Sequence, residues 1–180
     1  MSGLLDGTGL SAAPKTNDPD GAVFDYGLYL LTTRQYTEAF MVFDKLNKSH
    51  RHPACMFNLA LCHLQAGEWR SAALLLEEAG ALLSGKELSA IAPPEKKELI
   101  GKLSALEAQT EAYRQPMPLQ TPESYGHMAK DKILRLLVDV YAGCGLWDKA
   151  LNLGQKLEGK KYKNVMKAME LSKNKRQAAE

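Results

Sequence analysis

Five side chains that can bind metals or act as nucleophiles lie in one short stretch of the sequence. They are His50, His52, Cys55, Cys62 and His63. Zinc sites are built from such ligands, but this stretch contains neither paired Cys-x-x-Cys motifs nor a His-Glu-x-x-His motif. Cys55 and Cys62 are seven residues apart, so they share one face of a predicted helix with Leu59. Because such a face is typical of a buried packing surface, we expect packing here rather than a metal or cofactor site.

The sequence also lacks the motifs of common catalytic sites. It contains no P-loop, no dinucleotide-binding fingerprint that follows a strand, and no hydrolase nucleophile motif. Acidic pairs such as Glu77 and Glu78 lie on predicted exposed helix faces, where solvated charge is the ordinary explanation. We therefore expect no enzyme activity, no catalytic residue and no cofactor.

Composition and charge indicate an ordinary globular protein. The 180 residues are 45% hydrophobic, and 23 Lys and Arg against 21 Asp and Glu leave a net charge of +2. A chain of this length suits a single domain, and so small a charge gives no broad field that would attract nucleic acid or a membrane. Three cysteines in apolar helical patterns favour a reducing, cytoplasmic setting, and no apolar run approaches the roughly 20 residues of a membrane helix.

An aromatic residue followed three positions later by an alanine recurs along the chain. The copies are Tyr36 with Ala39, Trp69 with Ala72, and Trp147 with Ala150. The first two copies are 33 residues apart, a period typical of helical-hairpin repeats, and an insertion displaces the third. Each copy is predicted to be a pair of antiparallel helices in which the alanine lets the second helix approach the first. Gly67 and Gly145 open the turns of the second and third hairpins, where the first hairpin has Arg34.

The recurring pattern resembles the tetratricopeptide repeat. The residues that carry the resemblance are Gly27, Tyr36, Ala39 and Phe43 in copy one, Leu59, Ala60, Gly67, Trp69, Ala72 and Ala79 in copy two, and Leu137, Tyr141, Gly145, Trp147 and Ala150 in copy three. The resemblance implies an all-α superhelical stack of antiparallel helix pairs with about seven helices. It also implies a protein that binds proteins or peptides in a concave groove, lined by the first helix of each pair.

The expected organisation is a mobile leader followed by a single domain. The leader covers residues 1–17, and the domain, residues 18–180, holds repeats at about 20–52, 53–86 and 131–160, an inserted helix at 95–114, a Pro-rich loop at 115–122 and a basic capping helix at 161–176. The inserted helix has a narrow apolar stripe that we expect to face the repeats, formed by Leu99, Leu103, Leu106 and Tyr113. The last helix would shield the final exposed face of the stack.

The resemblance, carried over position by position, selects the residues expected to line the groove. They are Phe24, Asp25, Leu28, Leu31, Phe57, Asn58, Leu61, Leu64, Lys132, Arg135 and Asp139. Six of them are apolar, and an exposed apolar groove usually marks a binding site. We expect an adaptor or a client-holding chaperone, whose protein or peptide client the sequence does not identify. Two alternatives stay open, in which residues 86–122 cover the groove or the groove forms a homodimer.

Two segments suggest further hypotheses. Residues 116–122 are rich in proline and apolar residues, so this extended segment could occupy the groove of its own or a neighbouring molecule and yield to a client. The basic C-terminal segment could contact nucleic acid or an acidic surface. Its apolar positions, Tyr162, Val165, Met166 and Met169, instead favour a solvated capping helix, so nucleic acid is not an expected partner.

Overall fold

The computed structural model describes residues 19–84 and 97–177, and these form helices joined by short turns. The helices are α1 (Pro19–Thr32), α2 (Tyr36–Ser49), α3 (Pro53–Gln65), α4 (Trp69–Leu83), α5 (Lys97–Ala108), α6 (Thr121–Ser124), α7 (Gly126–Gly143), α8 (Trp147–Leu157) and α9 (Lys163–Gln177), with 3-10 helices at Ala112–Arg114 and Glu158–Lys160. The expected all-α architecture is confirmed. The expected leader, residues 1–17, lies outside the described residues.

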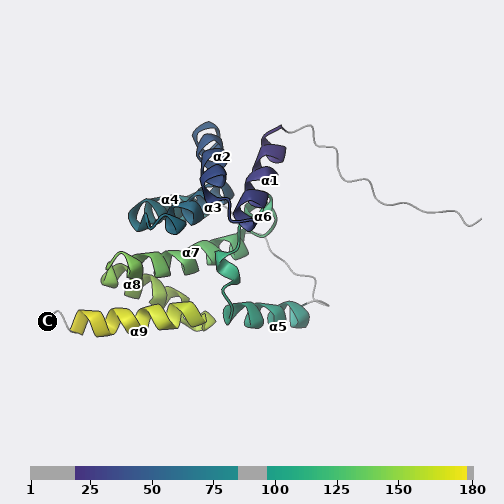
Figure 1. Cartoon of the computed structure of the whole chain (residues 1–180). Coiled ribbons are helices and arrows are strands. Elements are labelled where there is room, and N and C mark those ends of the chain that lie inside the picture. The colour runs from purple at the N-terminus through teal and green to yellow at the C-terminus, as the bar shows by residue number, and fades with distance from the viewer. Residues whose placement is uncertain (1–18, 85–96, 178–180) are drawn as a thin grey trace, which may run out of the picture.

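Three antiparallel hairpins, α1 with α2, α3 with α4 and α7 with α8, form a continuous stack. Figure 1 shows the layers in order, from α1 and α2 through α4 and α7 to α8 and α9. The insertion does not interrupt this order, because α4 packs directly on α7. At this contact the Trp69 ring lies so close to Gly143 that an added Cβ would be 2.6 Å from the ring. Glycine at this position therefore lets the third hairpin follow the second at close range.

Small residues bring the two helices of each hairpin together. Ala39, Ala72 and Ala150 have no exposed surface, as their role in close helix packing predicts. In the first hairpin the ring of Phe43 lies against Gly27, where an added Cβ would be 2.8 Å from the ring. The aromatic and small residues of the repeat pattern therefore meet inside the hairpins and between them.

The turns inside the three hairpins share one backbone conformation. Gly67 and Gly145 have positive φ angles of 77° and 72°, and Arg34 adopts the same left-handed conformation with a φ of 62°. Glycine adopts this conformation without steric cost, whereas a residue with a Cβ is strained there. The first hairpin therefore has the turn that the repeat pattern predicts, at a cost in conformational energy.

The insertion is not the expected single helix over 95–114. α5 ends at Ala108, and the chain turns before the 3-10 helix Ala112–Arg114. At this end of the helix the Arg135 guanidinium binds the carbonyl oxygens of Glu107 and Ala108, which have no i+4 partner because the helix stops there.

The leucines of the apolar stripe of α5 were also expected to face the repeats, and this expectation was wrong. Leu99, Leu103 and Leu106 are 58%, 50% and 64% exposed. The opposite side of the helix, with Ser104, Ala105 and Ala108, lines a cavity of about 510 Å³ that α7 also lines.

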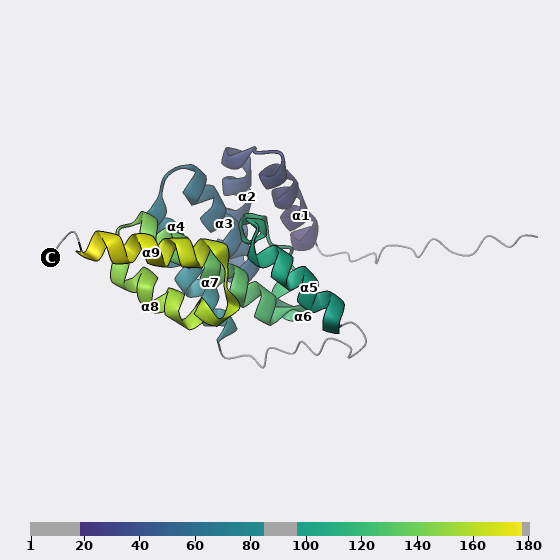
Figure 2. The ribbon, with the colours of Figure 1, turned by 90° about the horizontal axis from the view of Figure 1, so that it is seen from below.

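The chain closes the stack at its C-terminal end with α9. Figure 2 shows α9 lying along α8, where an added Cβ on Gly154 would be 2.5 Å from Met169. The structure has more than the expected seven or so helices, in part because α6 is a separate single turn before α7. Within the described residues, no helix combines the length and apolar character required to cross a membrane.

Candidate functional site: an inner face covered by the chain's own insertion

Residues 112–119, here called the strap, cross the inner face of the stack, and Asn58 of α3 holds them by the main chain. The Asn58 Nδ2 donates a hydrogen bond to the Met117 carbonyl oxygen at 2.9 Å, and the Met117 N–H donates one to Asn58 Oδ1 at 2.8 Å. The Asn58 side chain is fully buried, so both of these bonds form away from water. Asn58 therefore binds the strap as one strand binds another, through a paired donor and acceptor.

The Met117 side chain is also fully buried, and a lysine secures the residue before it. Lys132 of α7 donates a hydrogen bond from Nζ to the Pro116 carbonyl oxygen at 3.3 Å. The same ammonium lies 5.4 Å from the centre of the Phe57 ring, in a cation–π arrangement. Burial lowers the pKa of Lys132 from 10.5 to about 8, since desolvation disfavours the charged amine.

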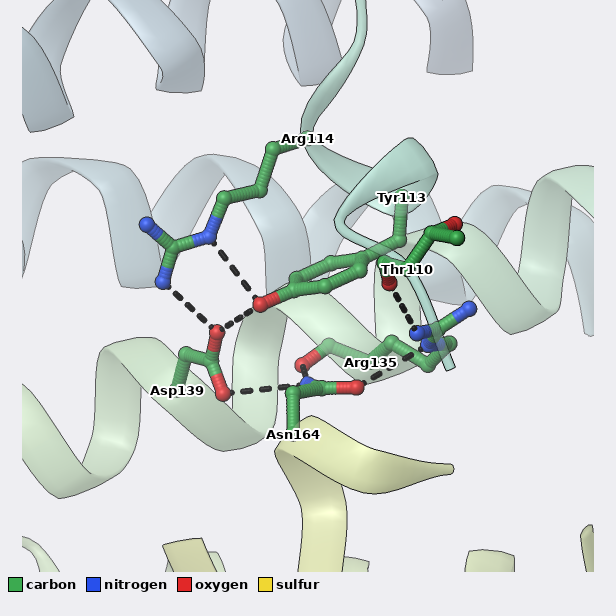
Figure 3. A network of polar contacts seen from close by, with 6 residues as sticks. All are labelled: Thr110, Tyr113, Arg114, Arg135, Asp139 and Asn164. Carbon is green, nitrogen blue, oxygen red and sulfur yellow. Dashed lines mark hydrogen bonds and ion pairs between the residues drawn. The ribbon is translucent and has the colours of Figure 1, made fainter. Parts of the chain in front are cut away.

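Tyr113 anchors the other end of the strap through its hydroxyl group (Figure 3). This hydroxyl donates to Asp139 Oδ2 at 2.5 Å and accepts a hydrogen bond from Arg114 Nε at 3.0 Å. Arg114 Nη2 also donates to Asp139 Oδ2 at 2.8 Å. Desolvation, followed by the hydrogen bond to Asp139, raises the pKa of Tyr113 above its ordinary value. The hydroxyl therefore stays protonated and keeps its role as a donor.

Arg135 of α7 joins the strap to α5 and α9. Its guanidinium lies between two aromatic rings, 4.4 Å from the centre of Tyr113 and 4.3 Å from that of Tyr162. It donates to the carbonyl oxygens of Glu107, in the last turn of α5, and of Thr110, just after the helix, at 3.2 and 3.1 Å. A cation at the C-terminal end of a helix also interacts favourably with the helix dipole.

Asn164 completes this network from α9. Its Oδ1 accepts a hydrogen bond from Arg135 Nε at 3.0 Å, and its Nδ2 donates to Asp139 Oδ1 at 3.0 Å (Figure 3). Arg135 and Asp139 therefore meet partners from three separate segments, and both are engaged within the chain.

The predicted groove residues differ in their surroundings. Asn58, Lys132, Arg135 and Asp139 lie together and hold the strap or the segment before it. Phe57 is fully buried beneath Lys132, while Leu31 and Leu61 belong to the core. Leu28 and Leu64 are half-buried and Asp25 is exposed. The inner face is therefore already covered at α3 and α7.

Phe24 was expected to line the groove, but it lies in the core of the first hairpin. Its side chain is 2% exposed and packs edge-on against Phe43, with the ring centres 5.3 Å apart. It lies inside the first hairpin because Gly27, one turn further along α1, leaves room for the Phe43 ring.

Four hydrogen-bonding residues of the site were not among the predicted groove residues. They are Tyr113, Arg114, Met117 and Asn164, and all come from segments outside the first helices of the repeats. A signal for Met117 is present in the sequence, since it lies between Pro116 and Pro118, neither of which has an N–H group. Met117 therefore offers the only main-chain donor in these three residues.

Three of the five candidate metal ligands contact three different partners. Cys55 donates to the Phe43 carbonyl oxygen, the His63 ring contacts Phe40, and His52 Nε2 lies 2.7 Å from Glu123 Oε1. Among the described residues, no group of three or more His, Cys, Asp or Glu side chains is arranged to bind a metal ion.

Comparison with known proteins identifies one family model. Residues 10–79 match the model described as anaphase-promoting complex, cyclosome, subunit 3, which covers the first two hairpins and less than half of the chain. No curated protein and no solved structure matches this chain. The stacked hairpins and this match define a tetratricopeptide-type repeat protein. Such repeat arrays serve as protein-interaction scaffolds.

Proposed function

We propose that this chain is a non-catalytic adaptor or client-holding chaperone that binds an extended segment of its client in the groove now filled by the strap. The observation that carries this proposal is the pair of hydrogen bonds from Asn58 to the main chain of Met117. A side chain that binds only main-chain groups holds an extended segment without requiring a particular side chain at that position. A client segment would make the same two bonds.

The character of the other groove residues supports the same proposal. Lys132 also binds a main-chain carbonyl oxygen, that of Pro116, and the Met117 side chain enters an apolar environment. Main-chain bonds give affinity to an extended peptide and buried side chains give specificity. The inner face therefore has both components of a peptide-binding site.

The proposal includes a reducing, cytoplasmic setting. Cys55 and Cys62 are buried as free thiols, and burial raises the pKa of each to about 12. Such thiols stay protonated and are protected from oxidation, so they act as core residues.

Site-specific photocrosslinking in cells that express the protein tests this function. A photoreactive amino acid replaces Leu28 or Leu64, the half-buried residues of the predicted groove, and the matched control replaces Leu74, which is 67% exposed on α4. We expect the same client protein to crosslink from Leu28 and Leu64, through one extended segment identified by mass spectrometry. Equal crosslinking of that protein from Leu74 would show that the groove is not the client site.

A further inference from the structure

The strap is bound in the way that a separate peptide ligand would be. Its contacts to the stack come from α3 and α7, which are hairpin helices, and the residue Gln115 within it has extended backbone angles, with φ −71° and ψ 149°. Its main chain is paired with the Asn58 side chain and not with a neighbouring strand or helical turn at Met117. The contacts of the strap therefore indicate which features of a bound segment the groove would recognise.

The first recognised feature is a single apolar residue between two prolines. The Asn58 amide needs a donor and an acceptor from the same residue, and within Pro116–Met117–Pro118 only Met117 has an N–H group. A one-residue shift would place a proline opposite Asn58 Oδ1 and leave this buried oxygen without a donor. Leaving a buried polar group unpaired is unfavourable, so the prolines define the register.

The second recognised feature is a tyrosine four residues before the methionine. The Tyr113 side chain is 3% exposed, its ring covers the Arg135 guanidinium, and its hydroxyl donates to Asp139. A phenylalanine at this position would keep the ring contact but would lose the donor to Asp139. A residue with no ring would also uncover Arg135.

We infer that the groove is specific for a partner segment with the same pattern, a tyrosine in a single helical turn followed four residues later by an unbranched apolar residue between two prolines in extended chain, and that the strap is the chain's own copy of that ligand. This inference depends on the proposed function, because it identifies the class of client that the groove binds. A partner with this pattern replaces the strap contact by contact. In the intact chain it competes with a tethered ligand, which lowers its apparent affinity.

The test uses a synthetic fluorescent peptide with the sequence of residues 110–122, and fluorescence anisotropy measures its binding to the full-length protein. Met117→Ser in the protein weakens the strap, so we expect this variant to bind the peptide about tenfold more tightly than wild type. Gln115→Ser is the matched control, because the Gln115 side chain is exposed. Circular dichroism checks that each variant is folded, and Tyr113→Ser in the protein replaces Met117→Ser if the latter does not fold.

Changes in the peptide then test the pattern itself. Serine in place of the methionine should weaken binding at least tenfold, and phenylalanine in place of the tyrosine about fivefold, since one charge-assisted hydrogen bond is lost. Adding Asn58→Ala to the strap-weakened protein should abolish binding. A scrambled peptide that binds as well as the native sequence would overturn the inference.

A second set of peptides separates this inference from the proposed function. If extended peptides selected from a random library bind the strap-weakened protein through Asn58 but the 110–122 peptide does not, the proposed function stands and the inference on specificity is wrong. If neither kind of peptide binds and no client crosslinks from Leu28 or Leu64, both are wrong.

Discussion

The hairpins and the strap are held by two different kinds of interaction. Inside the hairpins and between them, large side chains fill spaces left by small ones, as Phe43 does at Gly27 within the first hairpin and Trp69 does at Gly143 between the second and third. The strap is held mainly by polar side chains that bind its main chain or its tyrosine hydroxyl. Close packing depends on one exact shape, whereas hydrogen bonds to a main chain can be formed by any chain in the same register. The hairpins therefore depend on one exact fit, whereas the strap is held in the way that our proposal requires of a replaceable segment.

The largest expected effect tests the hairpins. Phe43→Ala removes a fully buried ring from between α1 and α2 and leaves a cavity. We expect the free energy of unfolding to fall by about 3–5 kcal/mol, measured by urea denaturation followed by circular dichroism. Phe40→Ala, at a 37% exposed position of the same helix, is the control and should cost much less. Equal losses would show that the first hairpin does not depend on internal packing.

The second prediction tests the strap alone. Asn58→Ala leaves the Met117 N–H and carbonyl oxygen without their partners. We expect the free energy of local opening at Met117 to fall by about 2–3 kcal/mol, measured by hydrogen exchange of its amide, with little change at amides in α4 and α8. Asn152→Ala, at an exposed site on α8, is the control. A uniform loss of protection across all helices would contradict the separation of strap and hairpins.

The third prediction concerns pH and Lys132. In the folded protein the pKa of this amine is lowered to about 8. Below that pH the amine is charged in both the folded and the unfolded protein, so the cost of burying the charge is fully present. Between pH 8 and the ordinary value of 10.5, the folded state loses the proton first, and the free energy of unfolding should therefore rise with pH. Denaturation between pH 7 and pH 10 should show this rise relative to Lys132→Met.

Lys167→Met, at an exposed position on α9, is the control for that comparison. The wild type and this control should have parallel pH dependences. If the Lys132→Met variant is also parallel to them, the Lys132 amine is not desolvated in the folded protein and its pKa is not lowered.

The smallest expected effect tests the turn of the first hairpin. Arg34→Gly removes the strain of a left-handed backbone angle, while the added freedom of glycine in the unfolded chain offsets part of the gain. We expect stabilisation by about 0.5–1 kcal/mol in thermal or urea denaturation, with no change in strap exchange. Destabilisation would show that contacts of the Arg34 side chain stabilise the fold by more than its backbone conformation costs.

The sequence predicts the hairpins well because their signals are local. Tyr36 with Ala39 and Trp69 with Ala72 recur at a fixed spacing, and Gly67 with Gly145 identifies the turns, so the position of Arg34 could be predicted too. These patterns depend on residues within one hairpin or its neighbour. The periodic arrangement of small and large residues therefore carries most of the fold.

The strap could be predicted only as an alternative, because its contacts join distant parts of the sequence. Asn58 and Met117 are far apart along the chain, and nothing near Asn58 shows that its partner is a main chain. The expected 95–114 helix was wrong because helix-forming residues continue past Ala108, whereas the chain ends α5 there with its last carbonyl oxygens bound by Arg135 from a distant part of the sequence. Likewise the sequence gives no reason to place Asn164 beside Asp139.

Arg135 connects three segments, the end of α5, the strap and the start of α9. Its guanidinium is enclosed by Tyr113 of the strap and Tyr162 before α9, and Asn164 of α9 binds both Arg135 and Asp139. A pull on α9 that separates Tyr162 and Asn164 from α7 removes half of that enclosure and one of the bonds that orient Asp139 for Tyr113. The strap and α9 are therefore coupled through Arg135 and Asp139, and a displacement of α9 would remove contacts that position the partners of Tyr113.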